Sequence, residues 1–326
     1  MRLVRTGLLL IVIAAAVIGG AVWWEDRNFN AGGPSEKETV VLVRPGGGAR
    51  AIAASLTEAG VIDTPLLFRI GVRRRDRTTE LKAGEYAFPA GASMAQVMDM
   101  LVSHKVIMHR ITIAEGLTSD MAVALINADT VLEGPVTVAP EGSLLPETYM
   151  FERGTTRAEL LARMRQAQKT LIEELWPKRK EGLPIGSVED AIKLASIVEK
   201  ETGLAAERPR IAAVFVNRLK TGMRLESDPT IIYGLTKGAP LGHPLRQSEL
   251  DTPNPYSTYQ IEGLPPTPIC NPGRDSLAAV LNPPDSDELF FVADGTGGHV
   301  FAKTGAEHLR NVAQWRRIER EQGRND

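Results

Sequence analysis

Apolar residues are most concentrated at the N-terminus, where Gly7 to Trp24 form a run of 18 residues without a charge. At 1.5 Å per residue this is about the minimum for crossing a hydrocarbon core of about 30 Å. Arg2 and Arg5 precede the run, and a Glu-Asp-Arg sequence follows it. The positive-inside rule therefore predicts a cytoplasmic tail over residues 1–6, a transmembrane helix over 7–24 and an extracytoplasmic remainder. A cleaved signal peptide is the alternative, but no small-residue cleavage site follows Trp24.

Beyond the apolar run, the polar residues 25–37 contain Gly and Pro and predict a short linker. Residues 38–114 then alternate between runs of β-branched residues and helical spacings, in the order β-α-α-β-α-β. This pattern predicts a small α+β domain. Its first four elements resemble a LysM module, which binds the glycan of cell walls, and a plain packing domain is the alternative. The expected strands cover 39–43, 84–88 and 106–113, and the expected helices cover 49–59 and begin at Thr64 and Ser93.

Residues 115–326 predict a second, larger α+β domain. A long amphipathic helix covers 157–175, and a second helix, 188–202, starts at Ser187 with Asp190 three residues later. Further helices are expected over 120–127 and 209–220, and the last hundred residues are rich in loops and proline, with a strand at 289–292 and a final helix from about residue 306. The predicted fold class is α+β, with one membrane helix and two domains.

Composition excludes several classes of function. The formal net charge of −2 gives no general attraction to nucleic acid. The single cysteine, Cys270, permits neither an intrachain disulfide nor a cysteine-rich zinc site, and the five histidines show no metal-ligand spacing. Phosphate-binding and dinucleotide-binding glycine motifs are missing from the sequence. We therefore expect neither a metal nor a cofactor.

Two glutamates, Glu199 and Glu201, lie at the polar end of the helix predicted over 188–202. A carboxyl group at the margin of an apolar surface has a raised pKa, because burial disfavours its charged form. A raised pKa suits the proton donor in glycosidic-bond chemistry. The two side chains project from opposite margins of the apolar face, so periodicity does not choose between them. The alternative is that neither has a catalytic role and both are surface residues near a helix end.

The loops that follow these helices are rich in amides and aromatic residues. Aromatic rings stack on the apolar faces of sugars and amides bind hydroxyl groups, so the loops could line a sugar groove, although most such residues serve loop packing. The candidates are Asn217, Arg218, Asp228, Tyr233, Tyr256, Thr258 and Tyr259.

Several motifs in the second domain resemble the YceG-like family of endolytic murein transglycosylases (MltG). The run ASIVEKET over 195–202 is one of them. The others are VFVNRL at 214–219, DPTIIYG at 228–234, YSTY at 256–259, GLPP at 263–266, FFVADG at 290–295 and LPETY at 145–149. The order of anchor, LysM-like domain and catalytic domain fits the same family, so the resemblance covers nearly the whole chain.

This resemblance implies that Glu201, the second glutamate of Glu-Lys-Glu-Thr, is the catalytic residue. It implies a lyase that cleaves the β-1,4 bond between N-acetylmuramic acid and N-acetylglucosamine in peptidoglycan strands and leaves 1,6-anhydro ends. The substrate-binding candidates are then Asn217, Arg218, Asp228, Tyr233 and Tyr259, together with Glu147 and Tyr149.

The family also implies a place and a set of partners. The catalytic part is expected in the periplasm at the bacterial inner membrane, with glycan strands as substrate and peptidoglycan synthases as partners. Two alternatives stay open: a muramidase that hydrolyses the same bond with Asp228 as second carboxylate, and a non-catalytic wall-binding scaffold.

Overall fold

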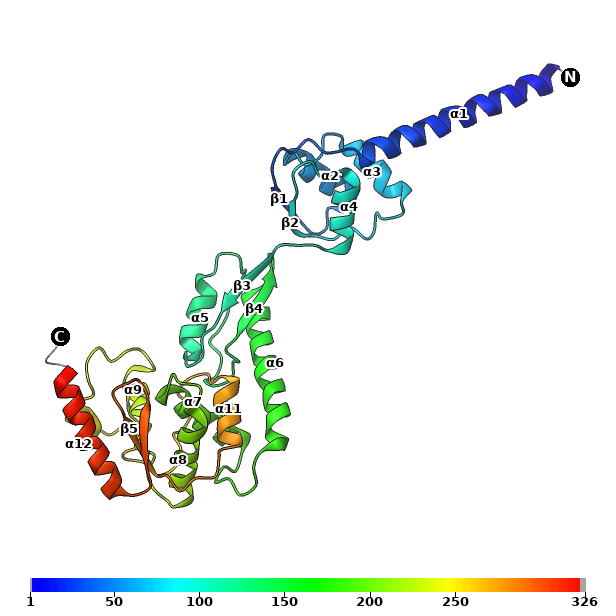
Figure 1. The fold of residues 1–326 in the computed structure, drawn as a ribbon. Helices are drawn as coiled ribbons and strands as arrows, with labels where there is room; N and C mark the ends of the chain where they lie inside the picture. Colours follow the sequence, from blue (N-terminus) through cyan, green and yellow to red (C-terminus); the bar gives the residue numbers. More distant parts are fainter. Residues whose placement is uncertain (1, 323–326) are drawn as a thin grey trace. The chain divides into compact units, whose positions relative to one another are not determined.

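A computed structural model describes residues 2–322, and its contacts divide the chain into two compact units. The first unit comprises residues up to 109 together with 150–154, and the second comprises 110–149 and 155–326. Strands β3 (Met108–Thr112) and β4 (Thr148–Glu152) pair with each other and contribute residues to both units (Figure 1). The boundary therefore falls within a strand, and not at residue 115 as the change in sequence pattern suggests.

Helix α1 (Arg2–Asn30) contains the apolar run. From Arg5 to Asn30 it is long and apolar enough to cross a membrane, by length and composition, and its large apolar side chains between Leu8 and Trp24 are exposed. The helix also continues through residues 25–30, where the sequence predicts the start of a linker. It continues because Phe29 is fully buried and because the side chains of Asn28 and Asn30 donate hydrogen bonds to backbone carbonyls one turn earlier.

The rest of the first unit contains an antiparallel pair of strands and three helices. Strand β1 (Thr39–Val43) pairs with β2 (Gly84–Phe88), and both strands have the bounds that the sequence predicts. Helices α2 (Gly48–Glu58) and α3 (Pro65–Arg74) connect the strands, and α4 (Met94–Ser103) follows them. Alternate strand residues, among them Val41, Val43, Tyr86 and Phe88, enter the core of this unit. The predicted order of strands and helices is confirmed.

The second unit is mainly helical. Its elements are α5 (Ser119–Ala128), α6 (Arg157–Leu175), a short 3₁₀ helix (Trp176–Lys178), α7 (Val188–Glu201), α8 (Arg208–Lys220), α9 (Asp228–Thr236), α10 (Gln247–Asp251), α11 (Arg274–Leu281), the hairpin of β5 (Phe290–Ala293) and β6 (His299–Ala302), and α12 (Gly305–Gln322).

Helix α7 lies in the core of this unit and packs against α8 and α11 (Figure 1). On its broad apolar face Leu194, Ala195 and Val198 are completely buried, as the periodicity predicts, whereas Val188 and Ile192 are partly exposed. The hydroxyl of Ser187 accepts a hydrogen bond from the backbone NH of Asp190 and caps the start of the helix. The packed helix therefore holds its last residue, Glu201, in a fixed place.

Candidate active site

Glu201 is the last residue of α7 and is partly buried. Its carboxylate accepts a short hydrogen bond from the hydroxyl of Ser227. Ser227 precedes α9, and its backbone NH donates to the hydroxyl oxygen of Thr258 at 2.9 Å. Thr258 is in turn hydrogen-bonded to Thr230 at 3.0 Å, and both are fully buried. The Glu201 carboxylate thus rests on a network of buried hydroxyl groups that joins α7 to α9.

The surroundings of Glu201 raise its pKa from 4.5 to about 7. Burial is the largest cause, and the negative charge of Asp228 adds to it. The hydrogen bond from Ser227 and the positive charge of Arg218 lower the pKa and offset part of this rise. A carboxyl group with this pKa holds a proton close to neutral pH and can donate it to a leaving group.

Glu199 has a different environment, although it lies two residues away. Its side chain is only 3 % exposed, and both carboxylate oxygens are occupied. One accepts from the guanidinium of Arg208 at 3.0 Å and the other from the backbone NH of Gly273 at 2.8 Å. Arg208 also binds Glu115 at 2.9 Å, and burial together with the Glu199 charge raises the pKa of Glu115. Glu199 is therefore fixed in a buried ion-pair cluster, whereas the Glu201 carboxylate is held by a neutral hydroxyl group.

Two of the candidate residues on α8 join this helix to the segment just before β5, and one of them also joins it to Leu225 before α9. The amide of Asn217 donates to the carbonyls of Ser286 and Glu288 at 2.7 and 3.0 Å. Arg218 is buried and donates to the carbonyls of Leu289 and Leu225 at 2.6 and 2.8 Å. These side chains hold loops together, and Arg218 additionally favours the charged form of Glu201.

Asp228 and Tyr259 form a pair at the start of α9. The Tyr259 hydroxyl donates to Asp228 Oδ1 at 2.8 Å, and burial is the main cause of the raised pKa of Tyr259. An open cavity of about 580 Å³ lies next to this tyrosine. Its other lining residues are Gln247, Leu250, Asp251 and Gln260. Amide, carboxylate and aromatic groups therefore surround a space that borders the Asp228 pair.

Tyr233 belongs to a second polar cluster, centred on Glu141. The tyrosine hydroxyl donates to the Glu141 carboxylate at 3.2 Å, and the backbone NH of Ser119 donates to it at 2.8 Å. Burial raises the pKa of Glu141. The ring of Tyr233 contacts that of Tyr256 edge-on, with centroids 5.0 Å apart, and the Lys237 ammonium lies 4.7 Å from the second ring. Sequence reasoning did not single out Glu141.

Two candidates, Glu147 and Tyr149, are not brought to Glu201. The Tyr149 side chain is buried, and its hydroxyl donates to the carbonyl of Leu145 at 2.7 Å. Glu147 is exposed, and its backbone carbonyl accepts from the NH of Ile113 at 3.0 Å. Among the described residues, neither has a contact with Glu201 or Asp228. Their motif leads into β4 and packs it, and a substrate-binding role for the two residues stays a prediction.

Ser227 is the residue at this site that the sequence analysis missed. A serine directly before Asp-Pro at a helix start indicates a cap, and its hydroxyl instead binds a carboxylate from another helix. Nothing in the local pattern of residues 224–230 indicates that partner.

Several known proteins have sequences similar to this chain. The chain is 29 % identical over 314 residues to the endolytic murein transglycosylase of Bacillus subtilis strain 168, covering 84 % of this chain and 85 % of that protein. It is 28 % identical to the endolytic murein transglycosylase of Streptococcus pneumoniae strain D39, over 86 % of this chain and 59 % of that longer protein. The crystal structure of a putative YceG-like protein from Listeria monocytogenes superposes with a TM-score of 0.51 at 28 % identity, covering 85 % of this chain and 99 % of the other. The sequence profile of the YceG-like family matches residues 41–314, so the chain belongs to the YceG-like family.

Proposed function

We propose that the protein is a lytic transglycosylase that cuts peptidoglycan strands internally, at the β-1,4 bond between N-acetylmuramic acid and N-acetylglucosamine. The observation that carries this proposal is the Glu201 carboxyl group, held by Ser227 in a partly buried site that raises its pKa to about 7. The names of the curated relatives support the same chemistry.

The proposed reaction uses one acid–base residue. Protonated Glu201 donates its proton to the glycosidic oxygen as the C1–O bond breaks, and N-acetylglucosamine leaves with a free hydroxyl. The C6 hydroxyl oxygen of the muramic residue then attacks C1 of the same sugar and gives its proton back to Glu201. A 1,6-anhydro ring forms, no water is consumed, and the enzyme ends in its starting state. The nucleophile is part of the substrate, so proximity favours the attack.

The two other parts of the chain have proposed roles that follow from position. Helix α1 anchors the protein in the bacterial inner membrane, because its apolar side chains are exposed over a length that can cross a bilayer. The remainder of the first unit directly follows the anchor in the sequence, and we assign it a LysM-like role toward glycan.

The test uses the full chain, purified in detergent and incubated with un-crosslinked glycan strands, with the products identified by mass spectrometry. Ends lighter by one water than reducing ends support the transglycosylase. Reducing ends would instead indicate a muramidase, in which Asp228 next to Glu201 serves as the second carboxylate. No cleavage would favour a wall-binding scaffold.

The pH dependence of the reaction gives a second, independent prediction. Glu201 must be protonated when substrate binds, so kcat/KM is expected to fall about tenfold per pH unit above a pH of about 7. No limb on the acid side is required, because the base is generated from the acid within the turnover. A hydrolase would also need an ionised second carboxylate, and an acid limb in the measured profile would indicate one.

Replacing Ser227 by alanine is expected to slow the reaction and to shift the alkaline limb of its pH–rate profile. The hydroxyl stabilises the charged form of Glu201, so its loss raises the pKa of Glu201 further and shifts the limb to higher pH. The carboxyl group also loses a strong hydrogen bond that orients it, and we expect kcat to fall about tenfold or more. The measurement is a pH–rate profile, with Ser103→Ala in the first unit as the control. An unchanged limb would show that Ser227 does not act through Glu201.

A further inference from the structure

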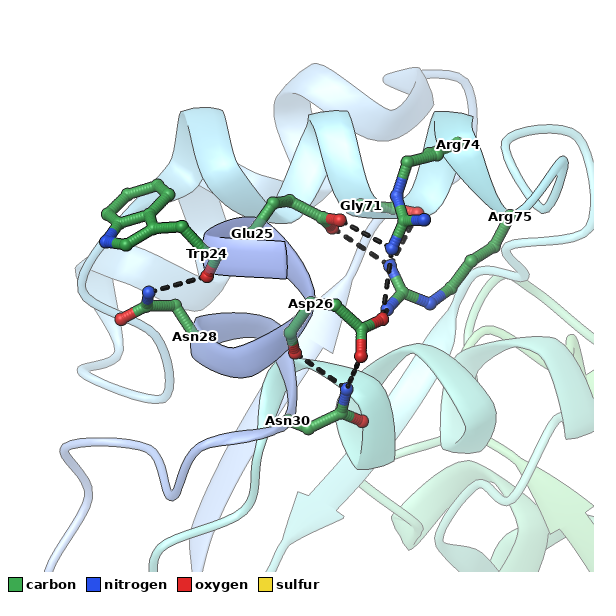
Figure 2. Close-up of polar contacts among 8 residues, drawn as sticks. All are labelled: Trp24, Glu25, Asp26, Asn28, Asn30, Gly71, Arg74 and Arg75. Atoms are coloured by element: carbon green, nitrogen blue, oxygen red, sulfur yellow. Dashed lines mark hydrogen bonds and ion pairs between the residues drawn. The ribbon is translucent and has the colours of Figure 1, made fainter. Parts of the chain in front are cut away.

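The end of helix α1 is fastened to helix α3 by four charged side chains (Figure 2). The buried carboxylate of Glu25 binds Arg74 at 2.6 Å and Arg75 at 3.0 Å. The neighbouring carboxylate of Asp26 binds the same two arginines, at 3.0 and 2.6 Å. Because each acid contacts both arginines, the group is a closed network and more than a single surface ion pair. We call these four residues the clamp.

Apolar packing reinforces the clamp. Phe29 is fully buried and stacks on Phe68 of α3, with ring centroids 6.2 Å apart. The guanidinium of Arg75 lies over the Phe29 ring, 4.0 Å from the ring centroid. Gly71 permits this approach, since a Cβ atom there would lie 2.3 Å from the Phe29 ring. The last turns of α1 and the helix α3 therefore form one packed body.

Among the described residues, none covers the opposite side of α3 completely. Leu66 and Ile70 lie next to each other there and are 61 % and 48 % exposed. Arg69 and Arg73 are exposed on the same side, and in the part of the chain that the structure describes neither has an acidic partner. The four residues share one face because they are spaced by three and four along the helix. We call them the outer face of α3.

The clamp fixes how far this face can lie from the end of the apolar run. The run ends at Trp24, and the clamp begins at the next residue. Two helical residues rise by about 3 Å, so the clamp holds the C-terminal end of α3, at Arg74 and Arg75, within about one turn of the point where α1 ceases to be apolar. Trp23 and Trp24, both exposed, mark that level in the way that aromatic residues mark membrane interfaces. Figure 1 shows α3 on the side of the first unit from which α1 extends.

We propose that the outer face of α3 binds the surface of the membrane that α1 spans, with anionic phospholipid headgroups as its ligand. Two unpaired arginines complement lipid phosphates, and two aliphatic side chains between them can enter the boundary of the acyl chains. The proposal rests on the membrane anchor proposed above. The outer face of α3 thus keeps the first unit against the bilayer, and the clamp joins α3 directly to the membrane helix α1.

The test places a fluorophore at single cysteines in the full chain, with Cys270→Ser as background. The positions are Ile70 on the outer face, Val40 as an exposed control on β1, and Val17 inside the apolar run. The protein is reconstituted into liposomes of phosphatidylcholine and phosphatidylglycerol in equal parts, and lipids with a spin label at the headgroup or deep in the acyl chain serve as quenchers. The Ile70 probe is expected to lose most of its fluorescence to headgroup quenchers, and the Val40 probe to keep it.

Charge variants then test the lipid headgroup. The pair Arg69→Gln and Arg73→Gln is expected to restore most of the Ile70 fluorescence. The matched pair Arg44→Gln and Arg50→Gln removes the same charge from exposed positions elsewhere in the unit and should leave quenching unchanged.

Each contrary outcome has a distinct meaning. An Ile70 probe that is not quenched, while the deep quencher acts at Val17, would overturn the proposal and leave the anchor intact. If neither probe is quenched, the anchor is wrong as well. Equal quenching in pure phosphatidylcholine, unaffected by the arginine variants, would overturn the role of anionic lipid. Cleavage of soluble glycan by the same samples reports on the proposed enzyme separately.

Discussion

Replacing Glu201 by glutamine is expected to abolish glycan cleavage, with a loss of about a thousandfold or more in kcat/KM. Glutamine keeps the shape of the side chain and its contact with Ser227, but it has no proton to give to the glycosidic oxygen and cannot act as the base for the C6 hydroxyl. The measurement is the release of 1,6-anhydro ends from un-crosslinked strands. Glu189→Gln is the matched control, because it makes the same change on the same helix at a side chain that is 69 % exposed.

The same variant should be more stable than the wild type at alkaline pH, which separates lost chemistry from lost folding. Glu201 has a pKa of about 7 in the folded protein, against 4.5 for a free glutamate side chain. Between these two values the folded protein holds a proton that the unfolded chain has released. Its contribution to stability is therefore complete below pH 4.5 and is lost as the pH rises to about 7, a change of about 3 kcal/mol. Glutamine is neutral throughout and does not suffer this loss.

Denaturant unfolding at pH 5 and at pH 8 measures this difference. A glutamine variant that gains stability only at the higher pH, and has no activity at either, would support both the buried carboxyl group and its role. A variant that still releases anhydro ends at the rate of the wild type would refute the assignment of Glu201.

The local sequence pattern does not predict which of the two glutamates, Glu199 or Glu201, is held in an ion pair, and the reason is physical. Glu199 and Glu201 lie on the same helix end and differ only in what other segments bring to them. Glu199 meets Arg208 from α8 and the NH of Gly273 before α11, whereas Glu201 meets Ser227 before α9. Periodicity describes one helix against a generic core, so it predicted the helix and its buried face and left the choice open. The family resemblance favours Glu201, and its catalytic role stays the proposal that the Glu201→Gln variant tests.

The segments that were predicted least well are those whose structure depends on a distant partner. Residues 25–30 are polar by composition, which predicts a linker. In the structure Phe29 packs against Gly71 and the helix continues to Asn30. The contact of Tyr149 is likewise not visible in its motif, because its hydroxyl donates to the carbonyl of Leu145, four residues earlier. In contrast, the bounds of β1, β2 and α6 follow from local signals alone, since turns and caps flank each of them.

Removing Arg208 is expected to destabilise the second unit strongly. Arg208→Leu would leave the Glu199 carboxylate, which is 3 % exposed, with the backbone NH of Gly273 as its remaining partner. Removing one member of a buried ion pair costs about 3 kcal/mol or more, because the other charge stays buried and uncompensated. Denaturant unfolding measures the loss. Arg210→Leu, two residues along the same helix, is the control: its side chain is 51 % exposed and its ion pair with Glu288 should contribute no more than about 1 kcal/mol.

The double variant Glu199→Leu and Arg208→Leu distinguishes a desolvation cost from a need for this particular ion pair. If the cost of the single change is that of an unpaired charge, removing the second charge should recover most of the lost stability. If the double variant folds as well as the wild type but cleaves glycan slowly, the cluster is needed to place Glu201, because it fixes the last turn of α7 to α8 and to the start of α11. If the double variant is as unstable as the single one, Arg208 stabilises the fold through contacts other than Glu199, with the Glu115 carboxylate as the next candidate.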